Sequence, residues 1–304
     1  MSVPPPIFIL ASPRSFTSVI CAMLGQHPEL YGVPELQLFT TETLLQLVQQ
    51  SKKGFGSLMI HGLVRTVAQL YAGEQTRESV EMAYRWIYNH RKCTTAEVYI
   101  ELCRKVSPLR IVDKSPAYAR IKPIETLNRI QKAFPDAHYI HLVRHPRTQG
   151  QSVMNINNGI VALISNSVDY STSPPTIDPQ YLWGRMQFRI LDFLSTVPSH
   201  QQMRLRGEDV LNDPRSHFEK ICKWLNLTWD ESVFEVMLRP QDSPYACLGP
   251  YGASFGNDTN FLQSPAFLYK PIAPSQLEGP LPWRNDNKGF IPKIIKLAQE
   301  FGYE

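Results

Sequence analysis

The chain has few cysteines, and none of them is arranged to stabilise a fold. Five occur among its 304 residues: Cys21, Cys93, Cys103, Cys222 and Cys247. Their odd number, their wide spacing and the absence of a C-x-x-C pair indicate neither a disulfide framework nor a zinc site. No cluster of aspartate and histidine residues stands out either, so we expect no metal at the functional site.

Long apolar runs and charged tracts are also missing. The N-terminus has no basic region, and its apolar run at 7–11 is too short for a signal peptide or a membrane span. The net charge of +4 is small and scattered, which argues against nucleic acid as a partner but suits an anionic nucleotide. We therefore expect a cytoplasmic protein that binds neither nucleic acid nor membranes.

No linker, repeat or low-complexity segment divides the sequence, so we expect a single domain over residues 1–304. Strand-like runs occur at 7–11, 110–113, 138–143 and 203–206, and each is followed by a helix-like stretch. This alternation predicts an α/β fold with a central parallel sheet that is flanked by helices on both faces.

Two further segments lie outside this alternation. Helical patterns at 41–71 and 79–103 predict a helical insertion over about 41–105. The segment 239–274 is rich in Pro, Gly, Ser and aromatic residues without periodicity, which is typical of a long loop. We expect this loop to form a lid over the acceptor substrate.

The first strand leads into residues 12–18 (SPRSFTS), which precede a helix predicted over 17–25. Unpaired amides and the helix dipole attract anions at a helix N-terminus, and Arg14 adds a positive charge. The loop lacks the glycines and lysine of G-x-x-x-x-G-K-[ST], and the G-x-G-x-x-G fingerprint is absent. It therefore indicates a small anionic group, although an ordinary helix N-cap would use the same hydroxyl residues.

This loop resembles the 5′-phosphosulfate loop, S-x-R-S-G-[ST]-T, of sulfotransferases that use 3′-phosphoadenosine 5′-phosphosulfate (PAPS). The resemblance implies a P-loop-like sulfotransferase fold and a PAPS site without a metal. The loop residues implied to bind the donor are Arg14, Ser15, Phe16, Thr17 and Ser18. Phe16 stands where the family has glycine, and phenylalanine does not readily adopt the positive φ that glycine allows.

A second segment, 137–146 (AHYIHLVRHP), resembles the family's strand that ends in an arginine. Arg144 and Ser152 have the family's spacing of eight positions, which implies that they bind the 3′-phosphate of the nucleotide. A guanidinium can bind phosphate oxygens in a bidentate manner, so the residue types fit this role.

Three other motifs extend the resemblance over almost the whole chain. Residues 109–116 resemble the strand that ends in D-K-[ST]-P near the transferred sulfate, and 203–210 stand where the family has Y-E-D-L, with Gly207 in place of tyrosine. Residues 281–284 resemble the W-R element that closes over the nucleotide. From these motifs we expect Arg206, Trp283 and Arg284 to contact the nucleotide.

Within this family, the chain resembles the sulfotransferase domains of curacin-type olefin-forming polyketide synthases and related free-standing bacterial natural-product enzymes. The residues that carry this likeness are 31–36, 112–116, 139–146 and 260–262. Those domains sulfate a β-hydroxyl on a carrier-bound acyl chain. Gly249 stands where we align a histidine of those domains, so the acceptor side differs.

Catalysis requires a base for the acceptor proton and cations for the departing phosphate. Glu35 resembles the glutamate base of several family members, and Arg14 and Lys114 are the predicted cations. Two alternatives stay open: Glu35 pairs with Arg14 or Lys114 as a structural residue, or the base is His141 or His145.

The resulting prediction is transfer of a sulfuryl group from PAPS to a hydroxyl or amine of a small organic acceptor, with adenosine 3′,5′-bisphosphate as product. The acceptor is expected to be a specialised metabolite, either an alkaloid or a polyketide. The first alternative is a carrier-bound β-hydroxyacyl chain, with an acyl carrier protein as partner. A P-loop kinase for small molecules and a non-catalytic nucleotide-binding protein are the alternatives from other classes.

Overall fold

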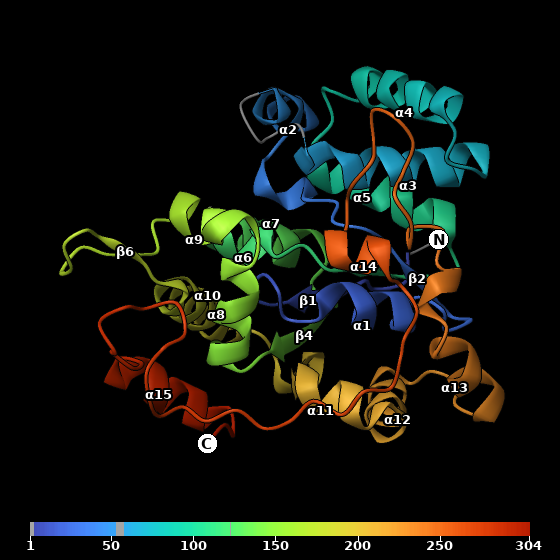
Figure 1. The fold of residues 1–304 in the computed structure, drawn as a ribbon. Coiled ribbons are helices and arrows are strands. Elements are labelled where there is room, and N and C mark those ends of the chain that lie inside the picture. The colour runs from blue at the N-terminus through green and yellow to red at the C-terminus, as the bar shows by residue number, and fades with distance from the viewer. Residues whose placement is uncertain (1–2, 53–57, 122) are drawn as a thin grey trace.

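A computed structural model describes residues 3–52, 58–121 and 123–304. Its centre is a five-stranded sheet in the order β2-β3-β1-β4-β7, and every neighbouring pair is parallel. The strands are β1 (Ile7–Leu10), β2 (Leu30–Gly32), β3 (Arg110–Asp113), β4 (His138–Val143) and β7 (Gln202–Arg206). The predicted α/β class with a central parallel sheet is confirmed (Figure 1).

Helices cover both faces of this sheet. They are α1 (Thr17–Leu24), α2 (Leu44–Ser51), α3 (His61–Ala72), α4 (Arg77–Asn89), α5 (Thr95–Val106), α6 (Ala117–Arg120), α7 (Pro123–Ala133), α8 (Pro146–Met154), α9 (Ile160–Ile164), α10 (Pro179–Leu194), α11 (Gly207–Asn212), α12 (Pro214–Leu225), α13 (Glu231–Met237), α14 (Thr259–Gln263) and α15 (Pro292–Glu300). A two-stranded antiparallel hairpin, β5 (Val168–Asp169) with β6 (Thr176–Ile177), lies apart from the main sheet. None of the described helices is long and apolar enough to cross a membrane.

The central strand β1 shows why two layers form. Successive side chains of a strand point to opposite faces, so a fully apolar strand must be covered on both. Phe8 and Leu10 join the core beneath α3, α5 and α7, whereas Ile7 and Ile9 join the core beneath α1 and α12. All four side chains are at most 1% exposed.

The helical stretches begin where side chains cap their first turns. Thr43, Thr76 and Thr94 each accept a hydrogen bond from the backbone N–H three residues later, forming capping boxes at α2, α4 and α5. The predicted helical segments 41–71 and 79–103 contain the four helices α2, α3, α4 and α5. These helices form the upper layer in Figure 1. Part of the first segment, 53–57, lies outside the described residues.

The structure adds detail to the sequence prediction at two places. The edge strand β2 was not among the predicted strands, because its three residues are too few to show an alternating pattern. The segment 239–274 is not a structureless loop, since it contains a short 3₁₀ helix, Pro240–Asp242, and the helix α14. In Figure 1, α14 lies directly above α1.

The carboxyl ends of parallel strands meet at one edge of a sheet, and ligands of such folds bind there. Residues 12–18, named the phosphate loop after the family motif that they resemble, follow β1. Lys114 follows β3, Arg144 follows β4 and Gly207 follows β7. The topology therefore brings four sequence motifs to one edge.

Candidate functional site

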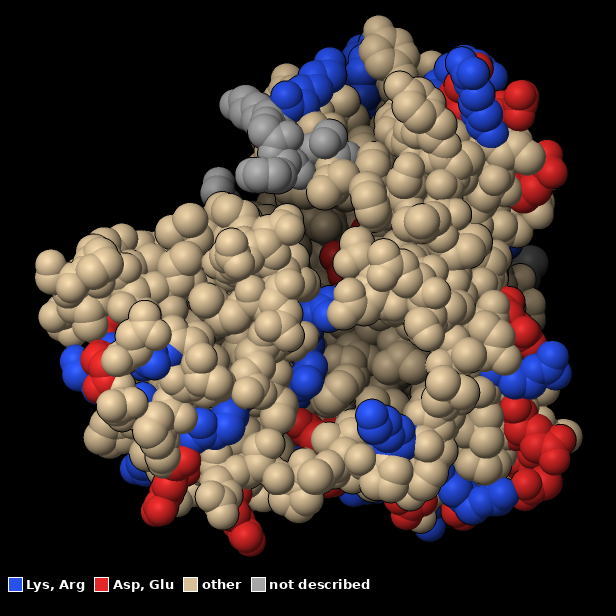
Figure 2. All heavy atoms as spheres, viewed as in Figure 1, with Lys and Arg blue, Asp and Glu red and all other residues tan. Residues whose placement is uncertain are grey.

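A cavity of about 530 Å³ opens at this edge of the sheet. Its wall consists of Pro13, Arg14, Phe16, Thr17, Ser18, Val19, Glu35, Gln37, Pro116, Ala117, Arg120, Arg144, Ser152, Val161, Asp258, Asn260, Phe261, Ser264, Pro265 and Ala266. The space-filling view shows that this face of the molecule is hollowed, with basic side chains along the hollow (Figure 2). Residues from both halves of the chain thus share one cavity.

The phosphate loop curls through two residues with left-handed backbone, Arg14 at φ 68° and Phe16 at φ 60°. This conformation costs a non-glycine residue on the order of 1–2 kcal/mol. Phe16 therefore adopts a positive φ, as the family's glycine can, despite this cost. Ser15 is fully buried and its hydroxyl lies 3.0 Å from that of Ser12, so Ser15 supports the loop from behind and does not line the cavity.

The Phe16 side chain fits against a residue from another motif. A Cβ added to Gly207 would lie 2.7 Å from Cδ2 of Phe16, which is too close for carbon atoms. The guanidinium carbon of Arg144 lies 4.1 Å from the centre of the Phe16 ring, in a cation–π contact. The two departures from the family motifs, at positions 16 and 207, therefore complement each other in space.

Arg144 faces the cavity without a carboxylate partner among the described residues. Its Nε donates to Thr148 Oγ1 at 3.1 Å, and its Nη1 donates to the carbonyl oxygen of Arg14 at 2.7 Å. Burial lowers the pKa of Arg144 to about 10, which still leaves the guanidinium charged at neutral pH. Ser152 lines the same cavity and accepts a hydrogen bond from Arg14 Nε at 3.0 Å.

Lys114 connects the phosphate loop to Glu35. Its Nζ donates to Ser18 Oγ at 2.9 Å and to Glu35 Oε1 at 2.8 Å. The Lys114 side chain is 1% exposed, whereas that of Glu35 is 26% exposed. An ammonium group this deeply buried requires a partner charge, which Glu35 supplies. Glu35 therefore has the predicted ion-pair partner and also reaches the cavity, where a base would act.

Asp258 is a site residue that the sequence analysis missed. It caps α14 by accepting hydrogen bonds from the N–H groups of Asn260 and Phe261, and its carboxylate pairs with the Arg14 guanidinium. Its own N–H donates to Ser18 Oγ at 3.3 Å. An aspartate before a helix-like stretch can be recognised as a cap from the sequence. Its partner Arg14 is 244 residues away, so only the fold brings the two side chains together.

A family model described as "Sulfotransferase family" matches residues 5–231. The chain belongs to the sulfotransferase family. The solved structure of the sulfotransferase domain from the curacin biosynthetic pathway is 25% identical, with a TM-score of 0.78, and covers 100% of this chain and 99% of that domain. The sulfotransferase domain from the Synechococcus PCC 7002 olefin synthase is 26% identical, with a TM-score of 0.71, and covers 100% and 96%. No curated protein matches.

These findings confirm the family resemblance on which the sequence analysis relied. In this sulfotransferase the cavity wall combines residues of the phosphate loop, the arginines Arg14, Arg120 and Arg144, and Glu35, which pairs with Lys114. Within residues 3–52, 58–121 and 123–304, no group of three or more His, Cys, Asp or Glu side chains is placed to hold a metal ion.

The two histidines proposed as alternative bases lie away from the cavity wall. His141 is completely buried within β4, where it contacts Gln187 Oε1 at 2.7 Å. His145 caps α8, and its Nδ1 accepts from the N–H of Arg147 at 3.1 Å. Burial lowers the pKa of each histidine to about 4. Neither imidazole is a wall residue of the cavity that contains Glu35.

Arg206, which we expected at the nucleotide, also lies outside the cavity wall. Its Nε pairs with Asp209 Oδ2 at 2.6 Å, and its Nη1 donates to the carbonyl oxygen of Gly302. It lines a separate hollow of about 270 Å³ together with His145. A direct contact between Arg206 and the nucleotide stays a prediction.

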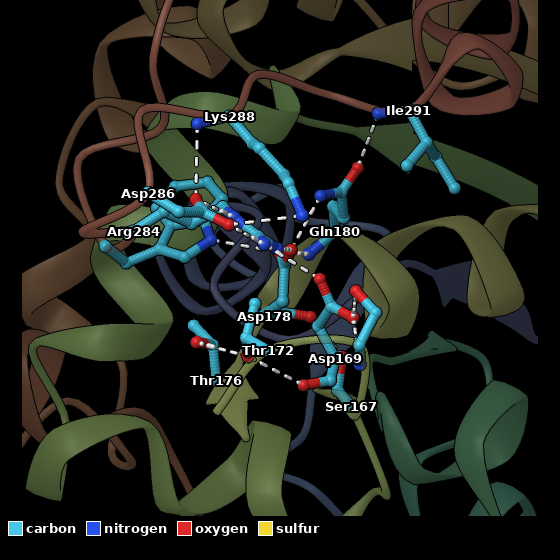
Figure 3. Close-up of polar contacts among 12 residues, drawn as sticks. Ser167, Asp169, Thr172, Thr176, Asp178, Gln180, Arg284, Asp286, Lys288 and Ile291 are labelled. Carbon is cyan, nitrogen blue, oxygen red and sulfur yellow. Dashed lines mark hydrogen bonds and ion pairs between the residues drawn. The ribbon is translucent and has the colours of Figure 1, made fainter. Parts of the chain in front are cut away.

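Arg284 is held in a polar cluster, shown in Figure 3, and Trp283 donates to the same cluster. Arg284 pairs with Asp169 and Asp286, each at 2.7 Å, and with Asp178. Trp283 Nε1 donates to Asp178 Oδ1 at 2.9 Å. Neither residue lines the cavity, so their predicted contact with the nucleotide is untested and their observed contacts are with this cluster.

Gln37 and Arg120 line the cavity near Glu35, and the sequence analysis did not select them. Gln37 is two residues beyond Glu35, and Arg120 ends the short helix that follows the D-K-S-P motif. Their nearness to motif residues was the available signal. Of the aromatic residues near these motifs, Phe261 lines the cavity, whereas Phe39 is fully buried in the core.

Proposed function

We propose that this sulfotransferase transfers a sulfuryl group from PAPS to a hydroxyl or amine of a small organic acceptor. The observation that supports the proposal most strongly is the composition of one cavity. Arg14, Arg144 and Ser152 lie together in its wall, and Glu35 lines the same cavity while pairing with Lys114. A polyanionic donor and an acceptor that must lose a proton require these two kinds of groups.

The donor would bind along the carboxyl edge of the sheet. Arg144 and Ser152 would hold the 3′-phosphate, with the fork of the guanidinium directed to two phosphate oxygens. The N–H groups at the start of α1 and the hydroxyls of Thr17 and Ser18 would hold the 5′-phosphosulfate. PAPS supplies an activated sulfuryl group, whose bond to the phosphate oxygen is the one that breaks.

Glu35 would accept the proton of the attacking hydroxyl or amine as the new bond to sulfur forms. Lys114 and Arg14 would stabilise the negative charge that develops on the departing phosphate oxygen. Lys114 contacts both Ser18 of the loop and Glu35, so its ammonium group could stabilise negative charge on the donor or on the Glu35 carboxylate. A purely structural Glu35–Lys114 pair is the alternative, and the first prediction in the Discussion separates the two.

The class of acceptor is inferred from the residues of the cavity wall. The cavity wall includes apolar residues, among them Val19, Val161 and Phe261, which suit an organic molecule. A specialised metabolite is therefore the favoured acceptor. The second candidate is a β-hydroxyacyl chain on an acyl carrier protein, which the likeness to domains from the curacin pathway and an olefin synthase favours.

The test is calorimetry with adenosine 3′,5′-bisphosphate and with AMP, which lacks the 3′-phosphate. Arg144→Ala should weaken binding of the bisphosphate by about 1.5–3 kcal/mol and that of AMP by much less. Arg85→Ala, on the exposed face of α4, is the matched control. Equal losses for both nucleotides would reject the assignment of Arg144. Turnover of ATP with Mg²⁺ and not of PAPS would indicate a kinase, and nucleotide binding without release of the bisphosphate would indicate a non-catalytic protein.

A further inference from the structure

The cationic side chains at the cavity differ in their ion pairs and hydrogen bonds. Arg14 pairs with Asp258 and donates to Ser152, and Lys114 pairs with Glu35. Arg120 also lines the cavity, yet its guanidinium makes no hydrogen bond or ion pair with any side chain or carbonyl of the described residues. A partly buried cation without a partner is unfavourable, so this position is suited to receiving an anion from outside.

Arg120 and Glu35 line the same cavity. Burial lowers the pKa of its guanidinium, and the negative charge of Glu35 acts in the opposite direction. Glu35 thus lies near enough for its charge to affect Arg120, although no ion pair forms between them. A molecule that presents a proton to Glu35 therefore lies in the same cavity as the Arg120 guanidinium.

Gln37 adds a second polar group without a partner at this end. It is only 9% exposed, and its Oε1 is buried with no hydrogen-bond partner in the described part of the chain. Its backbone is left-handed, at φ 54°, and its N–H donates to Ser115 Oγ at 3.2 Å. Ser115 in turn donates to the buried carboxylate of Asp113 at 3.0 Å. The protein therefore fixes Gln37 in a strained conformation and leaves its amide available to a ligand.

We propose, on the basis of the function proposed above, that the acceptor is a hydroxy acid whose carboxylate binds Arg120. The hydroxyl lies at Glu35, to which it gives its proton, and the amide N–H of Gln37 orients it by donating a hydrogen bond to its oxygen. The hydrocarbon part contacts the apolar wall formed by Pro116, Ala117 and Val161. A cationic acceptor such as an alkaloid would meet a like charge at Arg120, so this arrangement favours the polyketide-type acceptor over the alkaloid.

The experiment measures binding to the complex of the enzyme with adenosine 3′,5′-bisphosphate, because no turnover is needed there. The ligands are 3-hydroxydecanoate and its methyl ester, which differ in charge but share the hydroxyl and the chain. Wild type should bind the acid about 10- to 100-fold more tightly than the ester. Arg120→Ala should remove this preference, and Arg120→Lys should restore part of it. The control, Arg85→Ala, should preserve it.

Two further binding measurements identify which anionic group of the ligand binds Arg120. If 3-hydroxyacyl-phosphopantetheine binds more tightly than 3-hydroxyacyl-pantetheine in an Arg120-dependent way, the phosphate of a carrier arm binds Arg120 and the carboxylate assignment is wrong. Equal affinity for acid and ester in wild type, or equal losses for both in Arg120→Ala, overturns the proposal. Affinity for adenosine 3′,5′-bisphosphate is measured on every variant. Its retention shows that the variant is folded, and its absence in wild type would instead refute the proposed function.

Discussion

Arg144 and Arg284 were both predicted to bind the nucleotide, but their surroundings differ. The Arg284 side chain is 2% exposed and meets three carboxylates, from Asp169, Asp178 and Asp286. These partners raise its pKa and accept four hydrogen bonds from its guanidinium, so three acids already surround the charge. Arg144 instead contacts a hydroxyl, a carbonyl and the ring of Phe16, so its positive charge is not neutralised.

The partners of an arginine indicate its role better than its place in a sequence motif does. A guanidinium enclosed by carboxylates stabilises the fold, since removal of one member leaves buried charges unpaired. A guanidinium held by neutral groups at a cavity wall retains its capacity for a ligand anion. Substitutions in the cavity should therefore reduce function, and substitutions in the Arg284 cluster should reduce stability.

The largest expected effect on function is that of Glu35→Gln. The amide keeps the shape of the side chain but cannot accept a proton, so turnover should fall by about 10²- to 10⁴-fold. Affinity for adenosine 3′,5′-bisphosphate should remain near that of wild type. Steady-state kinetics and calorimetry on the same preparation measure both quantities. Turnover close to that of wild type, or matched losses of turnover and affinity, would show that Glu35 is a structural partner of Lys114.

Substitution of Arg284 tests the other half of the comparison. Arg284→Leu leaves three carboxylates without their shared cation, and Asp178 is completely buried. The free energy of unfolding should fall by about 3–5 kcal/mol, measured by urea denaturation. Lys288→Ala is the control, because its 58% exposed side chain pairs with Asp286 at the surface and should cost little. A loss of nucleotide affinity in folded Arg284→Leu would contradict the comparison and support the role predicted from the W-R motif.

His141 provides a test based on pH. Burial lowers its pKa to about 4 in the folded protein, below the ordinary value, so the unfolded chain binds the proton more readily between these two values. Its contribution is therefore complete above about pH 6.5 and is lost as the pH falls toward 4, with a loss of about 2 kcal/mol at pH 5.

His141→Asn cannot titrate and should show a correspondingly weaker decline of unfolding free energy on acidification. Asp113 acts in the opposite sense, since burial raises its pKa to about 7 and its contribution is lost as the pH rises. Both proteins contain Asp113, so the difference between them isolates the histidine. Identical pH dependence in the two proteins would contradict a buried neutral His141.

The smallest expected effect concerns Phe16 and Gly207. Gly207→Ala places a methyl group against the Phe16 ring and should displace it from Arg144, which weakens binding of adenosine 3′,5′-bisphosphate by about 1 kcal/mol. Phe16→Gly relieves the crowding, so the double variant should lose less affinity than the sum of the single variants. Calorimetry on the four proteins measures this coupling, and additive losses would show that the two positions act independently.

The sequence by itself determined the sheet and most of its strands. The apolar run 7–11 and the largely apolar 138–143 are typical of strands that are covered on both faces of a parallel sheet. Parallel strands deliver Arg14, Lys114 and Arg144 to the same edge. These features depend on local pattern and on topology, both of which a single sequence contains.

The tertiary structure alone decided which polar groups meet. Asp258 reaches Arg14, Phe16 occupies the space beside Gly207, and three carboxylates enclose Arg284. No local pattern specifies such contacts, because they join side chains from segments that are far apart in the chain. The charge of an arginine is fixed by its chemistry, but whether that charge is available to a ligand depends on which acids the fold places around it.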